Sequence, residues 1–308
     1  MAAEAGFPFR RSRVVTPAKG RAARWAGFLA CAASLTAPGL ALAATATDQL
    51  YERTVMTAAD GRCRLFAPAI GSALDAARAQ ARGAALRSGV SQTQVEGVEQ
   101  RARAKAASAA CNSADLATAA ARVRKAFEAY TTMQRINYPG DVSSWQAERT
   151  SSATIPIWRL SQSASFGADR LIFGLAGRNG LVTATVTFAD GARPYAARIV
   201  MRDPARTQGP YIDQRGKGLA AKVAPRSASL VFNAETREES PLTLLPTGAK
   251  TGLSFRFPNA PAEVISRLDP REAVTIEFSF AGRGGGEDLV RRAYIEVGDF
   301  AAGRAFLR

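Results

Sequence analysis

Apolar residues recur at three- and four-residue intervals through the first half of the chain, as one face of a helix requires. The clearest stripe covers residues 64–87 and ends at Gly89. Ser91, with Gln94 three residues later, has the pattern of a capping box and begins a second stripe that reaches Cys111. The connection is short, so the pattern predicts a hairpin of two antiparallel helices.

Two further helices are expected to flank this hairpin. One begins near Asp48 and ends where Asp60-Gly61 turns the chain. The other begins after Ser113, which is a suitable N-cap residue. Both carry apolar side chains along one face, so residues 44–133 are predicted to form a small helical bundle.

The predicted hairpin brings two cysteines together. Cys63 stands at its start and Cys111 at its end, and in an antiparallel pair these two ends lie side by side. We therefore predict a disulfide between them, which the chain-entropy model values at about 4 kcal/mol for a loop of this length. The alternative is a pair of buried free thiols.

The second half of the chain has a different pattern. A turn-rich segment at residues 134–153 is expected to be a linker, after which β-branched and aromatic residues alternate with polar ones. Strands are predicted over residues 155–160, 171–176, 181–188, 195–201, 227–233, 252–257, 274–280 and 292–297. Residues 154–308 should thus form an antiparallel β-sandwich-like domain, which makes the chain an α+β protein of two domains.

Two turn dipeptides shape this expectation. Asn179-Gly180 and Asp190-Gly191 each separate neighbouring strands, and such pairs supply the left-handed backbone that two-residue hairpins need. They predict a three-stranded meander. Residues 261–268 have a helical pattern, and Asp299 is placed to cap a short final helix.

The first 43 residues have the pattern of an export signal. A basic region precedes an apolar one, and Ala41-Leu42-Ala43 is a small-residue cleavage pattern, so the mature protein should begin near Ala44. This predicts a periplasmic or secreted protein with no transmembrane span after cleavage, which agrees with a cysteine pair in the mature chain. The alternative is a leader retained as a membrane anchor.

The composition excludes several kinds of chemistry. The chain has no histidine, so Ser-His-Asp and Cys-His catalytic groups and histidine-ligated zinc sites are impossible. No nucleophile elbow or phosphate-binding glycine loop is present. We expect no cofactor and no metal, and a non-enzymatic binding or structural role. The alternative is a hydrolase that acts on envelope glycans with a pair of carboxylates, because a sequence cannot show whether carboxylates meet in space.

Positive charge is concentrated in one stretch. The leader takes six of the 41 basic and one of the 26 acidic residues, which leaves a net charge of +10 on the mature chain. More than half of that excess falls within residues 193–226. The arginines predicted to form an anion-binding surface there are Arg193, Arg198, Arg202, Arg206 and Arg215.

Strand alternation sharpens this hypothesis. Within the expected strand, Arg198 and Arg202 should share the outer face. The partners we expect are anionic envelope components, such as lipopolysaccharide phosphates or peptidoglycan, or an acidic protein; nucleic acid is not expected. The alternative is an ordinary solvated face of an arginine-rich protein.

The end of the chain offers one resemblance. Residues 273–278 (AVTIEF) are followed by residues 294–300 (YIEVGDF) and by AFL at residues 305–307. This C-terminal third resembles the invasion-associated locus B family of exported bacterial proteins. The resemblance implies an envelope location and an interaction role, with no catalytic residues.

Overall fold

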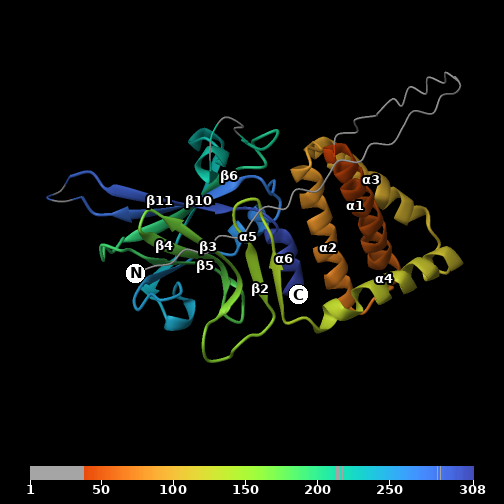
Figure 1. The fold of residues 1–308 in the computed structure, drawn as a ribbon, viewed down its shortest axis with the longest axis horizontal. Helices are drawn as coiled ribbons and strands as arrows, with labels where there is room; N and C mark the ends of the chain where they lie inside the picture. Colours follow the sequence, from red (N-terminus) through yellow and green to blue (C-terminus); the bar gives the residue numbers. More distant parts are fainter. Residues whose placement is uncertain (1–37, 213–215, 217, 283, 285) are drawn as a thin grey trace, which may run out of the picture. The chain divides into compact units, whose positions relative to one another are not determined.

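The computed structural model describes residues 38–308 except 213–215, 217, 283 and 285, with side chains from Ala46 onward. Most of the predicted leader, residues 1–43, therefore lies outside the described residues. The described chain forms a four-helix region and then two antiparallel sheets, which confirms the predicted α+β class (Figure 1).

The elements have the following bounds. The helices are α1 (Pro38–Cys63), α2 (Pro68–Arg87), α3 (Gln92–Ser108), α4 (Ala114–Thr132), α5 (Ala260–Ile265) and α6 (Phe300–Phe306), with 3-10 turns η1 (Leu219–Lys222), η2 (Arg226–Ala228) and η3 (Leu242–Leu244). The strands are β1 (Arg135–Tyr138), β2 (Trp145–Glu148), β3 (Trp158–Phe166), β4 (Asp169–Ala176), β5 (Leu181–Thr187), β6 (Ala196–Arg202), β7 (Ser229–Asn233), β8 (Thr236–Glu239), β9 (Leu253–Arg256), β10 (Ala273–Phe280) and β11 (Leu289–Glu296).

The helix starts follow the predicted caps. Ser91 Oγ accepts the Gln94 N–H at 3.2 Å and Gln94 Oε1 accepts the Ser91 N–H at 2.9 Å, which completes the capping box. Ser113 Oγ accepts the N–H of Leu116 at 3.3 Å at the start of α4. Local side-chain chemistry thus fixes where α3 and α4 begin.

The end of the first helix was predicted too early. Asp60-Gly61 does not turn the chain, because α1 continues to Cys63 and the backbone leaves the helix at Arg64, whose φ is 52°. The Asp60 carboxylate instead accepts the N–H of Phe66 at 2.9 Å and holds the exit from the helix. An aspartate at the end of a helix can therefore fix the following loop without ending the helix.

The Cys63–Cys111 disulfide is confirmed, with its Cα atoms 5.5 Å apart. It joins the end of α1 to the segment after α3. Both α2 and α3 pack mainly along α1, which lies between them, and have much less contact with each other (Figure 1). The disulfide therefore closes a three-helix arrangement and not a simple hairpin.

The two sheets share one core. The larger has the order β1-β2-β3-β4-β5-β9-β8 and the smaller β11-β10-β6-β7, and all pairings are antiparallel. Phe255 on β9 and Phe166 on β3 both contact Phe278 on β10, with ring centroids 5.7 and 6.2 Å apart. Side chains of both inner faces belong to one hydrophobic cluster, as in a sandwich.

The segment predicted as a linker contains two strands. β1 and β2 lie within residues 134–153, and Trp145 and Tyr138 are fully buried there. The Glu296 carboxylate accepts backbone N–H groups from the connecting loop, including that of Asp141 at 2.7 Å. A strand of four residues is too short to show a clear alternation of apolar and polar residues. The turn residues between the two strands therefore led to the prediction of a linker.

The predicted meander is correct only in its first turn. Asn179-Gly180 joins β4 to β5 as a hairpin, with Ala176 paired to Leu181. Asp190-Gly191 instead carries the chain from one sheet to the other, since β5 pairs with β9 and β6 pairs with β10 and β7. A turn dipeptide fixes a change of direction, whereas pairing depends on which strands bury a common face.

The helical region and the sheets meet at α2 and α6. The Arg87 guanidinium at the end of α2 donates to the Asp299 carboxylate at 2.9 Å, so this aspartate precedes α6 as predicted but does not cap it with its side chain. Arg149 donates to the backbone oxygens of Phe306 and Tyr130, at 2.8 and 3.1 Å, and lies over the Phe306 ring. These contacts tie α4 and α6 together.

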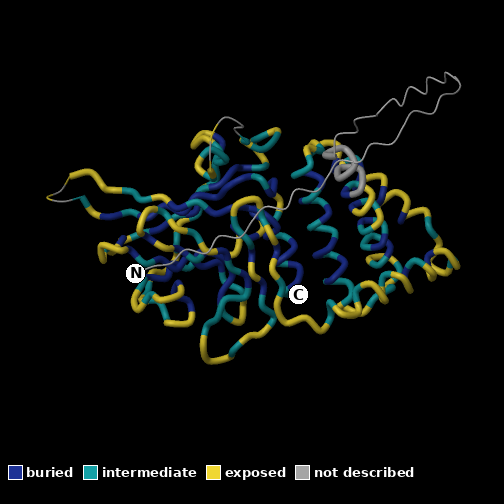
Figure 2. The backbone as a smooth tube through the Cα atoms, viewed as in Figure 1, coloured by how far each residue is buried: buried dark blue, intermediate teal, exposed yellow. Residues whose placement is uncertain are grey.

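Burial differs along the chain. The inner faces of the sheets and of α2 are buried, whereas α4 is exposed along most of its length (Figure 2). Within the residues that the structure describes, none of the helices is both long and apolar enough for a membrane span.

Candidate functional site

The basic segment 193–226 begins just before β6, includes that strand and continues through the loop that carries η1 to the start of η2. On β6, Ala197, Ile199 and Met201 are buried in the core. Arg198 and Arg202 alternate with them and project from the opposite face, as predicted. Both arginines therefore lie on the outer face of the four-stranded sheet, but their surroundings differ.

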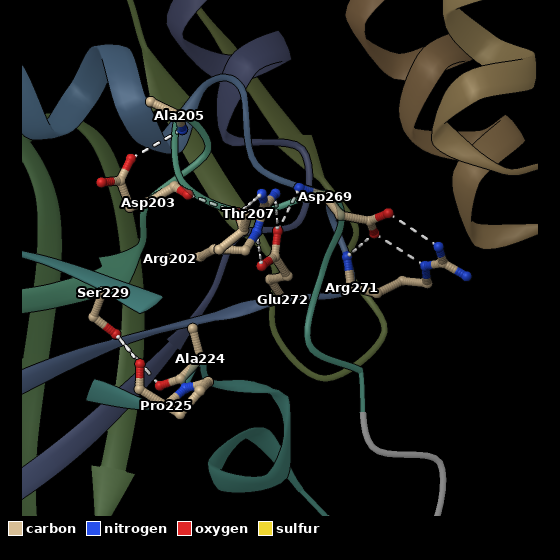
Figure 3. Close-up of polar contacts among 10 residues, drawn as sticks. All are labelled: Arg202, Asp203, Ala205, Thr207, Ala224, Pro225, Ser229, Asp269, Arg271 and Glu272. Atoms are coloured by element: carbon tan, nitrogen blue, oxygen red, sulfur yellow. Dashed lines mark hydrogen bonds and ion pairs between the residues drawn. The ribbon is translucent and has the colours of Figure 1, made fainter. Parts of the chain in front are cut away.

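Arg202 is an internal residue, with only 7% of its surface exposed. Its Nε and Nη2 donate to the two oxygens of Glu272 at 2.6 and 2.9 Å, and its Nη1 donates to Thr207 Oγ1 at 2.9 Å. Glu272 also accepts the Asp269 N–H at 2.9 Å, while Arg271 turns to the Asp269 carboxylate (Figure 3). Arg202 thus holds the segment before β10 and does not face solvent.

Separate hydrogen bonds fix the two ends of the long loop after β6. Asp203 accepts the Ala205 N–H through its carboxylate and the Thr207 hydroxyl through its backbone oxygen, at 2.9 and 2.6 Å (Figure 3). At the far end, Ser229 Oγ donates to the Pro225 oxygen at 2.9 Å. The loop therefore leaves and rejoins the sheet at defined positions.

Arg198 belongs to a different group, which we call the Glu277 cluster: Arg198, Arg226, Arg292 and Glu277. The Glu277 carboxylate accepts Nε of Arg198 at 2.6 Å, Nε of Arg292 at 2.8 Å and Nη2 of Arg226 at 3.2 Å. The Glu277 side chain is 4% exposed, whereas those of Arg198, Arg292 and Arg226 are 32%, 45% and 68% exposed. Three cations thus meet one buried anion.

The cluster explains the ionisation of its central group. Burial alone would raise the pKa of the Glu277 carboxyl, but hydrogen bonds from Arg292 and Arg198 and the nearby positive charge outweigh burial. Its pKa therefore lies below the ordinary value. With Glu277 ionised, the cluster carries a net charge of +2, and part of each guanidinium reaches the surface.

The other predicted residues have separate positions. Arg193 pairs with Glu239, and Arg206 is exposed, with its backbone N–H bonded to the Asp203 oxygen at 3.2 Å. Arg215 lies outside the described residues. Among the described members of this set, Arg202 is therefore buried in an ion pair, whereas the side chain of Arg198 is partly exposed.

Three members of the cluster, Glu277, Arg292 and Arg226, were not among the predicted site residues, although Arg226 ends the basic segment. Glu277 is the one charged residue of β10 and stands between Ile276 and Phe278, a position where a charge needs a partner. The strand register pairs Glu277 with Arg292 on β11 and with Arg198 on β6. Glu277 therefore has an arginine opposite it on each neighbouring strand. An isolated glutamate inside a predicted strand was therefore the available signal.

One cavity is a candidate active site for the alternative function, a hydrolase that uses a pair of carboxylates. A cavity of about 410 Å³ lies between α2, α3 and the segments around α5 and α6, and both Glu99 and Asp299 line it. Burial raises the pKa of Asp299 even though Arg87 binds its carboxylate. Glu99 has Arg78, Arg82 and Arg103 within 3.6–3.9 Å. Both carboxylates are thus held by arginines.

Metal chemistry has no candidate site in the part of the chain that the structure describes, where no three His, Cys, Asp or Glu residues are grouped to hold an ion. No protein-family model, curated protein or solved structure matches the chain. Its function must therefore be argued from its own residues.

Proposed function

We propose that this chain is an exported component of the bacterial cell envelope that works by binding and not by catalysis, and that it binds phosphate groups of lipopolysaccharide through the Glu277 cluster. The leader pattern of residues 1–43 and the disulfide in the following region both support export, because disulfides persist in oxidising compartments. The resemblance of residues 273–307 to the invasion-associated locus B family of exported proteins is a further argument for export.

The observation that carries the binding role is the charge imbalance around Glu277. Within the described residues, Arg198 and Arg292 contact the protein through Nε, which leaves their Nη groups for a ligand. Guanidinium groups bind phosphate oxygens through such paired donors. The buried carboxylate holds the guanidinium groups in place, so a phosphate would meet donors that are already oriented.

The direct test is retention on immobilised lipopolysaccharide at increasing salt. Arg198→Gln with Arg292→Gln should weaken retention by about tenfold, since charge-assisted hydrogen bonds are lost. The matched control is Arg101→Gln with Arg122→Gln, which removes two exposed charges from α3 and α4. Equal losses in both double variants would reduce the effect to net charge, and binding to dephosphorylated lipopolysaccharide would exclude a phosphate ligand. If the protein is retained on peptidoglycan or an acidic protein and not on lipopolysaccharide, that molecule would be the partner in place of lipopolysaccharide.

Export has a separate test. Cell fractionation should find the protein outside the cytoplasm, and thiol alkylation without reductant should leave Cys63 and Cys111 unmodified. A cytoplasmic protein with two reactive thiols would remove the basis for an envelope role.

The second candidate function is a carboxylate-dependent hydrolase acting on envelope glycans. The raised pKa of Asp299 favours it, as does the presence of both Asp299 and Glu99 in the lining of the 410 Å³ cavity. If turnover of a glycan substrate is found, Asp299→Asn should abolish it. Full turnover in that variant would exclude Asp299 as the acid.

A further inference from the structure

Besides the cavity of about 410 Å³, the described chain has a pocket that shares no residue with the Glu277 cluster. It has a volume of about 380 Å³ and is formed by β3, the β4–β5 turn, α5 and the end of α6. This is near the lower end of the volumes of about 300–1,000 Å³ seen for small-molecule sites. Its lining residues are Arg159, Leu175, Arg178, Asn179, Gly180, Asn259, Ala262, Glu263, Arg304, Leu307 and Arg308.

Positive charge dominates this pocket. Even without Arg308, the lining includes the guanidinium groups of Arg159, Arg178 and Arg304 against the single carboxylate of Glu263. Glu263 pairs with Arg304 and is itself 62% exposed. Among the described residues, neither of the other two arginines forms a salt bridge, although the Glu148 carboxylate acts on Arg159 from a greater distance.

Arg159 is the most informative of these side chains. It is half-buried on β3, and its Nε donates to the backbone oxygen of Glu148 at 2.9 Å, which fixes the direction of the guanidinium group. Burial lowers the pKa of Arg159, and the Glu148 carboxylate offsets this effect only in part. A half-buried cation whose direct hydrogen bond goes to a carbonyl oxygen can gain further charge-assisted hydrogen bonds from an external anion.

The remaining lining complements an anion on a polar body. Asn179 and Asn259 are exposed at the rim and offer amide donors and acceptors. Leu175 and Ala262 are buried and give the pocket an apolar wall. This mixture suits a ligand with hydroxyl groups and a small apolar face.

We infer that this pocket binds a small hydroxylated ligand carrying one phosphate group, of the size of a hexose monophosphate, with Arg159 and Arg178 on the phosphate. Because the site is separate from the Glu277 cluster, the inference does not depend on the proposed function. Arg178 stands in the exposed β4–β5 turn, where a substitution leaves the core unchanged.

The experiment is calorimetric titration of the full chain, at low ionic strength, with glucose 1-phosphate, inorganic phosphate and glucose. Glucose 1-phosphate should bind best, inorganic phosphate more weakly and glucose not detectably. Arg178→Glu should weaken binding of glucose 1-phosphate by about tenfold or more, since one charge-assisted contact is replaced by repulsion. The matched control is Arg122→Glu on α4, which should bind like the wild type.

Arg178→Gln removes the charge without reversal and should give a smaller loss, which separates repulsion from loss of a contact. Arg198→Gln with Arg292→Gln should leave this binding intact, so failure of the proposed function and failure of this site give different results. Absence of binding to the wild type, equal losses with Arg122→Glu, or equal binding of glucose and glucose 1-phosphate would each overturn the inference.

Discussion

The helical region and the sheet region stabilise themselves by different means. The sheets enclose one cluster with large side chains such as Trp145, Phe173, Phe255 and Phe278. The helices have two smaller clusters, in which alanine is the most frequent residue. Alanine buries little apolar area, so a helical core of this kind gains little free energy from burial.

The disulfide lies where that difference matters. Cys63 and Cys111 are 48 residues apart, and closing such a loop is worth about 4 kcal/mol in the chain-entropy model. α4, which follows the disulfide, has only Leu116 and Ala120 buried among its described residues. The covalent link is therefore found in the region whose core consists mainly of small side chains, and the core with large aromatic side chains has none among its described residues.

The largest effect should come from the aromatic core. Trp145→Ala removes contacts with Phe173 and Phe300 and the indole hydrogen bond to the Val297 oxygen, so we expect a loss of about 4 kcal/mol. Urea unfolding followed by circular dichroism measures this loss. Leu74→Ala in the helical core is the matched change and should cost less, about 2–3 kcal/mol. The reverse order would contradict the comparison.

Removing the disulfide should have the next largest effect. Cys63→Ala with Cys111→Ala should lower the free energy of unfolding by about 3 kcal/mol. Hydrogen exchange should show faster exchange in α1–α3 and little change in the sheets. Uniformly faster exchange throughout the described chain would mean that the two regions unfold as one cooperative unit.

The contact between the regions should matter less. Arg87→Ala leaves the buried Asp299 carboxylate without its partner, and we expect a cost of about 2 kcal/mol at neutral pH. Burial already raises the pKa of Asp299, and loss of Arg87 should raise it further. The folded state then holds the proton more tightly, so the deficit of the variant should shrink as pH falls toward the ordinary aspartate pKa of 3.8. Unfolding of both proteins from pH 7 to pH 3.5 tests this, and a deficit independent of pH would contradict it.

The smallest effect concerns the Glu277 cluster. Since the pKa of Glu277 is below the ordinary 4.5, its ionised form stabilises the fold above that pH, and the contribution is lost as pH falls through the lowered value. Glu277→Gln should cost about 1 kcal/mol at pH 7 and remove this part of the acid sensitivity. Unfolding measured from pH 7 to pH 3 should show a flatter pH dependence in the variant. An unchanged pH dependence would mean that other carboxyl groups govern acid stability.

Local chemistry was predictable from the sequence, and long-range pairing was not. Caps at Ser91 and Ser113 and the Asn179-Gly180 turn depend on residues that are neighbours in the chain, and each was predicted correctly. The assignment of β5 and β6 to different sheets depends on partners more than 60 residues away, such as β9 and β10. Alternation gives the face of a strand but not its neighbour.

Prediction of the candidate site from the sequence had the same limit: the face of each arginine was predictable, but its partner was not. Arg198 and Arg202 were correctly placed on one face, yet one lies in a partly exposed cationic cluster and the other in a buried ion pair. The difference arises from Glu277 and Glu272, which approach from β10 and the segment before it. Charge counted along the sequence could not separate them, because neutralisation depends on contacts in space.

Hydrogen exchange of the full chain, with and without deacylated lipopolysaccharide that retains its phosphates, tests the central claim most directly. We expect slower exchange in β6 and β11, on either side of Glu277, with α2–α4 unchanged. The Arg198→Gln, Arg292→Gln double variant should lose that protection. Protection centred on the helices, or equal protection in the double variant, would contradict binding through the Glu277 cluster.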